Sequence, residues 1–192
     1  MDKPPAVPDN RANPAHCITR MNLPCFENAP LKSAAWKFLL LLLAFSTPVF
    51  ADTERASVWI GGELFSLEIA ADSATRARGL MHRSQIDPAG GMLFVFPTNR
   101  PRSFWMKNCL VDMDILYLDG DGVVIRQHQM FAEPLQQEKE SMAEYHRRLQ
   151  RYPSLDPARF AIELKHGTAA RLKINQGDRV EMDIPELLQV AR

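Results

Sequence analysis

The stretch from Gly90 to Gly122 constrains the fold more than any other part of this chain. It reads GGMLFVFPTNRPRSFWMKNCLVDMDILYLDGDG, with three apolar runs, a polar loop between the first two, and an Asp-Gly turn at its end. Short apolar runs bounded by Pro, Asn, Asp and Gly are typical of strands joined by turns. We therefore expect a β-rich core centred on this stretch.

Within and just after this stretch, four segments have strand character. They are Met92–Phe96, Ser103–Met106, Val111–Leu118 and Val123–Met130, and the polar loop Pro97–Arg102 separates the first two. An Asp-Gly turn between apolar runs predicts that the last two strands pair antiparallel.

The residues before it predict a hairpin and a short helix. Strand-like segments at Ser57–Ile60 and Glu63–Ala70 are joined by Gly61-Gly62, as in a two-residue hairpin. Asp72 is placed to cap the start of a helix over Ser73–Arg78.

The residues after it predict a longer helix and two more strands. Apolar residues between positions 134 and 152 are spaced 7, 3, 4 and 3 apart, which indicates one stripe of a helix. Phe160–Lys165 and Arg179–Ile184 again have strand character. In total we expect about eight strands with two inserted helices, and short strands with Gly, Asp and Pro turns favour a mainly β sandwich or barrel.

The N-terminal part has the pattern of an export signal. Residues 1–30 are rich in Pro, Asn and Ala, after which Lys32 and Lys37 precede an apolar run over 38–45. Small residues then occupy positions −3 (Val49) and −1 (Ala51) of a cleavage site, which predicts a signal peptide cleaved after Ala51. We expect an extension and signal peptide over residues 1–51 and one domain over 52–192.

Two questions about this segment stay open. The initiator is either Met1 or Met21, and the alternative to cleavage is an inner-membrane anchor through residues 36–50. The apolar run 38–45 is eight residues long, whereas a spanning helix needs roughly 20. We therefore expect a periplasmic or secreted protein, with membrane contact only through an uncleaved signal segment.

Composition excludes several classes of protein. Apolar residues make up 46% of the chain and charged residues 24%, values that exclude disorder throughout. Residues 1–51 hold five of the 23 basic and three of the 23 acidic residues, so 52–192 has a net charge of −2. That balance predicts no nucleic-acid partner. Cys109 is the single cysteine of 52–192, so no internal disulfide is expected.

Several motifs together resemble the DUF192 family. They are Arg76–Arg83, Gly91–Phe96, Phe104–Asn108, Leu110–Ile115, Tyr152–Glu163 and Gly177-Asp178. The resemblance covers roughly residues 57–184 and implies a single domain, often exported in bacteria, folded as a jelly-roll-like antiparallel β-sandwich. The family has no established biochemical activity. This chain departs from it at Cys109, at Asp112 and in the length of the 134–152 segment.

Basic residues around Trp105 are the first candidate site. Guanidinium groups hold carboxylate or phosphate, and an indole offers a stacking surface, so a small anionic or saccharide ligand is our first hypothesis. The candidate ligand-binding residues are Arg76, Arg83, Trp105, Lys107 and Asn108. The alternative is that these cations pair internally with Asp112, Asp114 or Glu163.

Two further hypotheses remain, and no catalytic residue is assigned. A hydrolase-type enzyme would use Asp112, Asp114 or Glu163 as its acid–base group. A structural module would dock through the 134–152 helix. Methionines near His82 and His128 lack metal-ligand spacing, so no metal or other cofactor is expected. The partner is an unknown small ligand or an envelope protein, and most simply the chain is a non-enzymatic accessory protein of the cell envelope.

Overall fold

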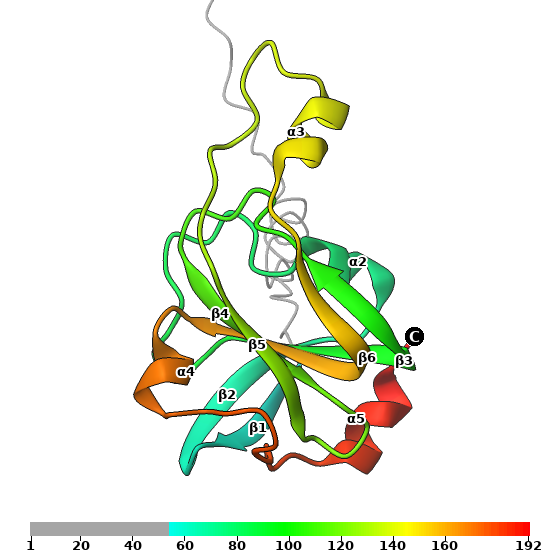
Figure 1. Cartoon of the computed structure of the whole chain (residues 1–192). Coiled ribbons are helices and arrows are strands. Elements are labelled where there is room, and N and C mark those ends of the chain that lie inside the picture. The colour runs from blue at the N-terminus through cyan, green and yellow to red at the C-terminus, as the bar shows by residue number, and fades with distance from the viewer. Residues whose placement is uncertain (1–53) are drawn as a thin grey trace, which may run out of the picture. The chain divides into compact units, whose positions relative to one another are not determined.

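Residues 54–192 are the part of the chain that this computed structural model describes. Six strands form one sheet in the order β1-β2-β3-β6-β4-β5 (Figure 1). The strands are β1 (Arg55–Ile60), β2 (Glu63–Ala70), β3 (Met92–Phe104), β4 (Met113–Leu118), β5 (Val124–Met130) and β6 (Tyr152–Lys165). The helices are α2 (Ser73–Arg78), α3 (Met142–Arg148), α4 (Thr168–Arg171) and α5 (Ile184–Val190).

The mainly β class is confirmed, and so are the first hairpin and the helix that follows it. Asp72 accepts hydrogen bonds from the N–H groups of Ala74 (2.8 Å) and Thr75 (3.0 Å) at the start of α2. The expected eight strands and jelly-roll-like sandwich are not confirmed, because the described residues form one six-stranded sheet. The sheet is also mixed, since α2 lies in the crossover that makes β2 and β3 parallel.

The predicted strand over Arg179–Ile184 is wrong, because this segment forms only two isolated β-bridges. Arg179 bridges to Val123 beside β5, and Glu181 bridges to Trp59 in β1. One short segment therefore touches both edge strands of the sheet, which brings those edges close together. The chain does not continue as a strand, because Asp183 caps α5 with a 3.0 Å bond from the N–H of Glu186.

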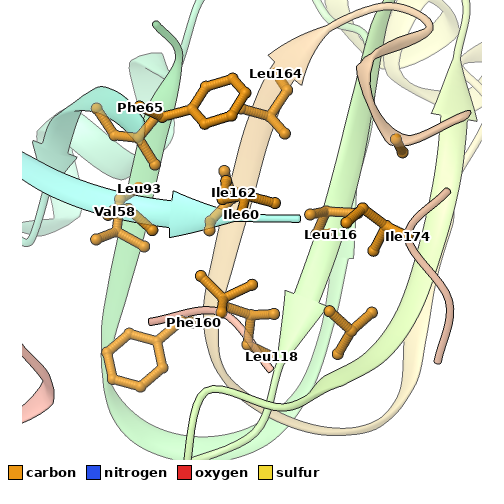
Figure 2. Close-up of a cluster of buried hydrophobic side chains, with 14 of the residues drawn as sticks. Val58, Ile60, Phe65, Leu93, Leu116, Leu118, Phe160, Ile162, Leu164 and Ile174 are labelled. Carbon is orange, nitrogen blue, oxygen red and sulfur yellow. The ribbon is translucent and has the colours of Figure 1, made fainter. Parts of the chain in front are cut away.

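The inner face of this curved sheet holds one hydrophobic core. Side chains from β1, β3, β4 and β6 point toward one another there (Figure 2). Val58, Leu93, Leu116 and Ile162 are fully buried in it. These buried residues alternate with others along each strand, because successive side chains of a strand point to opposite faces of the sheet.

A second core covers the opposite face of the central strands. It contains Met92, Phe94, Ile115, Tyr117 and neighbouring residues of the loops that follow α2 and β3. The strands β3, β6 and β4 are thus buried on both sides. A polar side chain on the second face must therefore find a partner or a cavity within the protein.

The predicted polar loop Pro97–Arg102 is instead part of β3. The pairing of β3 with β6 shifts register between Val95 and Arg100, and again between Pro101 and Ser103. Proline cannot donate a ladder hydrogen bond and is tolerated at such irregularities. The facing part of β6 has prolines as well, with Pro101 opposite Pro157.

The predicted 134–152 helix is also wrong, because only Met142–Arg148 is helical. Ser141 and Glu144 form a capping box that starts α3 there (yellow in Figure 1). The apolar stripe does not share one environment: Leu135 is 46% exposed, whereas Tyr145 is 1% exposed. Tyr152 belongs to β6, so the long docking helix of the third hypothesis does not exist.

The predicted signal segment over 38–45 and its cleavage after Ala51 lie outside the described residues. Within residues 54–192, none of the helices has both the length and the apolar character needed to cross a membrane.

Candidate functional site

Glu163 is a buried carboxyl in the central strand β6. Its neighbours Ile162 and Leu164 point to the inner core, so strand alternation directs Glu163 to the second face. The residue is 5% exposed, and its Oε2 atom has no hydrogen-bond partner. Buried polar atoms are nearly always hydrogen-bonded, so an orphaned carboxyl oxygen indicates either strain or a place for a ligand.

The surroundings of Glu163 favour its neutral form. Burial raises the pKa of Glu163 to about 8, and the backbone N–H of Leu80 opposes this shift only in part. At neutral pH the group is therefore mostly protonated. A protonated carboxyl has one O–H donor as well as an acceptor oxygen, so it can hydrogen-bond a neutral group.

A pocket of about 340 Å³ lies over Glu163. One wall is formed by the end of α2 and the turn from Gly79 to Met81. The opposite wall is formed by the end of β3 and the following loop, residues 103–109. Gly79 has φ of 50°, a backbone conformation that favours glycine, and a Cβ atom there would be in van der Waals contact with Glu163 Oε2 at 3.5 Å.

Aromatic rings line the pocket between its walls. Phe94 and Phe104 meet edge to face with their centroids 4.8 Å apart, and Phe104 meets Tyr117 in the same way at 5.7 Å. Such packing fixes the rings and leaves a rigid apolar surface. Tyr117 donates a 2.5 Å hydrogen bond to the backbone oxygen of Tyr152, which holds this ring in place.

Three basic side chains stand around the pocket. They are Arg76, Arg78 and Lys107. Among residues 54–192, no ion pair engages Arg78 or Lys107. Arg76 donates to the carbonyl oxygens of Val95 (3.0 Å) and Arg192 (2.7 Å), and burial lowers its pKa. Arg76 thus stabilises the pocket wall through hydrogen bonds to backbone oxygens, whereas Arg78 and Lys107 are available at the rim to bind a ligand.

Trp105 borders the pocket, but part of its ring is already covered. The guanidinium carbon of Arg151 lies 3.9 Å from the ring centroid, and the His146 ring lies 4.7 Å from it. Lys107 Nζ lies 5.7 Å from the same centroid. Burial, with the charges of Lys107 and Arg151, lowers the pKa of His146. The ring therefore sits within a group of cations.

Asn108 does not line this pocket. Its backbone N–H donates to the hydroxyl of Tyr145 (2.9 Å), and that hydroxyl donates to Asn108 Oδ1 (3.2 Å). Asn108 has φ of 55°, a conformation that asparagine tolerates better than most residues. It joins α3 to the loop after β3.

Arg83 lies at a different site and has its own carboxylate. Its two Nη atoms donate to Glu68 at 2.8 and 2.6 Å, and Arg55 lies 3.6 Å from the same carboxylate. The alternative of internal pairing thus applies to Arg83, with Glu68 as partner in place of Asp112, Asp114 or Glu163. These groups border a second groove of about 930 Å³.

Comparison with known proteins agrees with the sequence motifs. The model of the family DUF192, described as "Uncharacterized ACR", matches residues 56–182. The chain belongs to the DUF192 family. No curated protein resembles it significantly.

Two crystal structures resemble the DUF192 domain. One is a protein of Sinorhizobium meliloti 1021, named as a candidate transcription regulator. It is 32% identical over 68% of this chain and 95% of that chain, with a TM-score of 0.55. The other is a protein of unknown function from Novosphingobium aromaticivorans DSM 12444. It is 30% identical over 66% and 83% of the two chains, with a TM-score of 0.53.

The other two carboxylates proposed for catalysis are occupied in this DUF192 domain. Asp114 is fully buried and accepts from the N–H groups of Ala169 (2.8 Å) and Gly167 (3.2 Å). His166 Nδ1 lies 3.4 Å from Asp114 without hydrogen-bond geometry. Asp112 precedes β4 and accepts from the N–H of Ala132 at 2.7 Å. Both aspartates therefore organise loops, and they do not share a strand face.

Cys109 borders the same pocket as Glu163. Burial and the nearby Glu163 charge raise the pKa of the Cys109 thiol to about 12. A thiol that stays protonated is a poor nucleophile and a poor metal ligand. Among residues 54–192, no group of three or more His, Cys, Asp or Glu side chains is arranged to hold a metal ion.

Sequence reasoning named three of the residues that border the pocket as ligand-binding candidates. They are Arg76, Trp105 and Lys107. It missed Arg78 and the aromatic walls, and it placed Glu163 only among the acid–base alternatives and the possible internal ion-pair partners. A signal for Glu163 was present: one acidic residue within the apolar segment FAIEL of a central strand.

Proposed function

We propose that this DUF192 domain is a non-enzymatic binding protein for a small anionic ligand, and that the ligand occupies the pocket over Glu163. One observation carries the proposal. The buried carboxyl of Glu163, one oxygen of which has no hydrogen-bond partner, lies under an aromatic-lined pocket, and the rim cations Arg78 and Lys107 form no ion pair within residues 54–192.

The pocket has the composition that small-molecule sites use. Such sites are mostly apolar, have a few converging polar groups, and take up about 300–1,000 Å³. A volume of about 340 Å³ suits a ligand of one ring or a short chain. The apolar body would lie against Phe94 and Phe104, and the anionic group would lie at the rim.

The rim supports an anion better than an uncharged sugar. Sugar binding uses an open aromatic face, but Arg151 and His146 already pack on Trp105. Arg78 and Lys107 supply positive charge, and charge-assisted hydrogen bonds to a carboxylate or phosphate are stronger than neutral ones. The saccharide half of the original hypothesis is therefore set aside.

A second candidate function is acid–base chemistry by Glu163. The raised pKa of Glu163 favours it, because catalytic carboxyl groups often titrate near the working pH. Of the three carboxylates considered, only Glu163 borders this pocket. A reaction product formed from a bound ligand, and lost in Glu163→Gln, would establish this function.

The cell envelope is the proposed location. The support is a basic flank, an apolar run and small residues at Val49 and Ala51, since together they match an export signal. An exported accessory protein would meet small organic acids outside the cytoplasm. The name of the Sinorhizobium relative gives no reason to add a DNA partner, because residues 52–192 carry a net negative charge.

A thermal-shift and calorimetric panel tests the proposed function. The full chain would be mixed with benzoate, inorganic phosphate and glucose at pH 7. We expect an anion to raise the melting temperature, because it binds the native state and not the unfolded chain. Glucose should have no effect on the melting temperature. Lys107→Ala and Arg78→Ala should each weaken anion binding by about tenfold, since hydrogen bonds to charged groups are worth about 1.5–3 kcal/mol.

Lys139→Ala is the matched control. Lys139 is exposed, lies outside the pocket and has no ion pair among the described residues. Its removal changes the net charge equally, so a purely long-range effect would appear in this variant as well. Equal weakening in all three variants, or no anion binding at all, would overturn the proposed site.

A further inference from the structure

We propose that Glu163 anchors the inner end of the ligand, and that the ligand is a single-ring aromatic acid with a hydroxyl group opposite its carboxylate. This inference rests on the proposed function, and it goes further by naming the ligand class and the role of Glu163.

The pocket has two chemically different ends. Glu163 comes from a strand in the middle of the sheet and is 5% exposed, so it forms the inner end. Arg78 is exposed and Lys107 is half-buried, so the cations stand at the outer end. A ligand that satisfies both ends needs an anionic group outside and a second polar group inside.

The space between the two ends favours a flat ring. Phe94 and Phe104 are locked edge to face, and Phe104 is locked against Tyr117. Aromatic rings pack favourably on such rigid surfaces. A volume of about 340 Å³ accommodates a substituted aromatic ring.

The inner group is a hydroxyl and not an ammonium. Burial dominates the environment of Glu163 and keeps its carboxyl mostly neutral at pH 7. A hydroxyl can both donate to and accept from a neutral carboxyl. An ammonium would have to pass Arg78 and Lys107, would need an ionised Glu163, and would leave its own charge in an apolar pocket.

Tyr117 and Cys109 lie beside Glu163, but neither is free to hydrogen-bond the hydroxyl group of the ligand. Tyr117 uses its hydroxyl on the Tyr152 backbone oxygen, and Cys109 Sγ lies 3.5 Å from the Lys107 backbone oxygen. Both are buried and both stay protonated, since burial raises the pKa of each. The Glu163 carboxyl, which borders the pocket, is thus the polar group at its inner end that a bound hydroxyl would contact.

Isothermal titration of the full chain with three probes tests the inference. The probes are benzoate, 4-hydroxybenzoate and 2-hydroxybenzoate at pH 7. With the carboxylate at the rim, only the 4-hydroxyl reaches the inner end of the pocket. We expect 4-hydroxybenzoate to bind about tenfold more tightly than benzoate, the equivalent of one buried hydrogen bond, and 2-hydroxybenzoate to bind like benzoate.

Substitutions then assign the gain to Glu163. Glu163→Leu should abolish the tenfold difference in affinity between 4-hydroxybenzoate and benzoate, because leucine cannot hydrogen-bond the hydroxyl group. Glu163→Gln should keep part of the difference, since an amide also bonds a hydroxyl. Glu138→Gln, an exposed carboxyl outside the pocket, is the control and should keep all of it. Melting curves would show that each variant is folded.

The outcomes separate the two proposals. If benzoate binds and depends on Lys107, but the 4-hydroxyl adds nothing or its gain survives in Glu163→Leu, the anchor role is overturned and anion binding stands. If none of the three acids binds the folded chain, both proposals are overturned.

Discussion

At the scale of single residues, Glu163 is the side chain whose burial is hardest to explain by stability. A buried carboxyl with one unpartnered oxygen weakens the native state, and an apolar residue of similar size would pack there at lower cost. A native protein keeps such a group where it does something else. Binding of the proposed ligand would account for the buried carboxyl at position 163.

The stability of the domain should depend on pH through Glu163. Its pKa of about 8 in the folded state is above the ordinary value of 4.5, so between these values the folded state keeps a proton that the unfolded chain releases. The free energy of unfolding therefore falls as pH rises from about 4.5 to 8. At about 1.4 kcal/mol per pKa unit, the fall is roughly 3–5 kcal/mol.

Glu163→Gln isolates this contribution, because the amide does not titrate. Urea unfolding of both proteins at a series of pH values should give a stability gap that grows in favour of the variant up to about pH 8 and is then constant. A gap that is the same at pH 4.5 and pH 8 would mean that Glu163 titrates normally.

Cys109 should be inert in the native protein. A thiol with its pKa raised to about 12 has almost no thiolate at pH 8, and the residue is 6% exposed. We expect iodoacetamide to leave the Cys109 peptide unmodified in folded protein and to modify it fully in urea, as followed by mass spectrometry. Rapid labelling of that peptide without denaturant would show that the pocket opens.

At the scale of elements, the turn into β3 fixes the distance between β3 and β6. Gly91 has φ of 146°, and a Cβ atom there would lie 2.2 Å from the backbone oxygen of Glu163. No side chain fits between the two strands at this point. The close approach of Gly91 therefore helps to set the position of Glu163 itself.

Gly91→Ala should destabilise the domain severely. The added methyl group clashes with backbone that belongs to a central strand, so we expect a loss of at least about 3 kcal/mol, or failure to fold. Gly120→Ala is the matched control, because a Cβ atom at Gly120 would meet nothing within 4 Å. Equal melting temperatures for the two variants would contradict this packing.

Local patterns in the sequence predicted local elements well. The Gly61-Gly62 hairpin and the Asp72-capped helix depend on neighbouring residues alone, and both form as expected. The long strands β3 and β6 were missed because a polar loop was expected over Pro97–Arg102 and a strand only over Phe160–Lys165. Pairing between two irregular strands extends both of them, which no local pattern reveals.

The site was predictable only in part, for a similar reason. Lys107 and Trp105 follow one another closely in the sequence, so their grouping was visible. Glu163 lies beside the turn that follows α2 only because β6 pairs between β3 and β4 in the sheet. Long-range pairings of that kind do not leave a periodic signal in one sequence.

At the scale of the whole molecule, the described domain encloses one core and covers another. The segment 179–181 bridges the edge strands β1 and β5, which protects both edges from pairing with other chains. The pocket at Glu163 is lined by residues of the second core, so the proposed ligand site lies on that face of the sheet.

Export makes a separate prediction for the complete chain. Expressed in a Gram-negative host, the protein should appear in the periplasmic fraction with Asp52 as its first residue, because the export pattern ends at Ala51. N-terminal sequencing of the fractionated protein checks this. Replacing Ala51 with a bulky residue should leave an uncleaved, membrane-associated form, whereas a cytoplasmic full-length product would contradict export.

The titration of the Glu163 carboxyl by carbon-13 NMR tests the proposed site most directly. In the protein without ligand, the side-chain carboxyl resonance assigned through Glu163→Gln should titrate with a midpoint near pH 8, and 4-hydroxybenzoate should move both the resonance and its midpoint. A midpoint near 4.5 that no aromatic acid alters would show a solvated, paired carboxylate and contradict the ligand site.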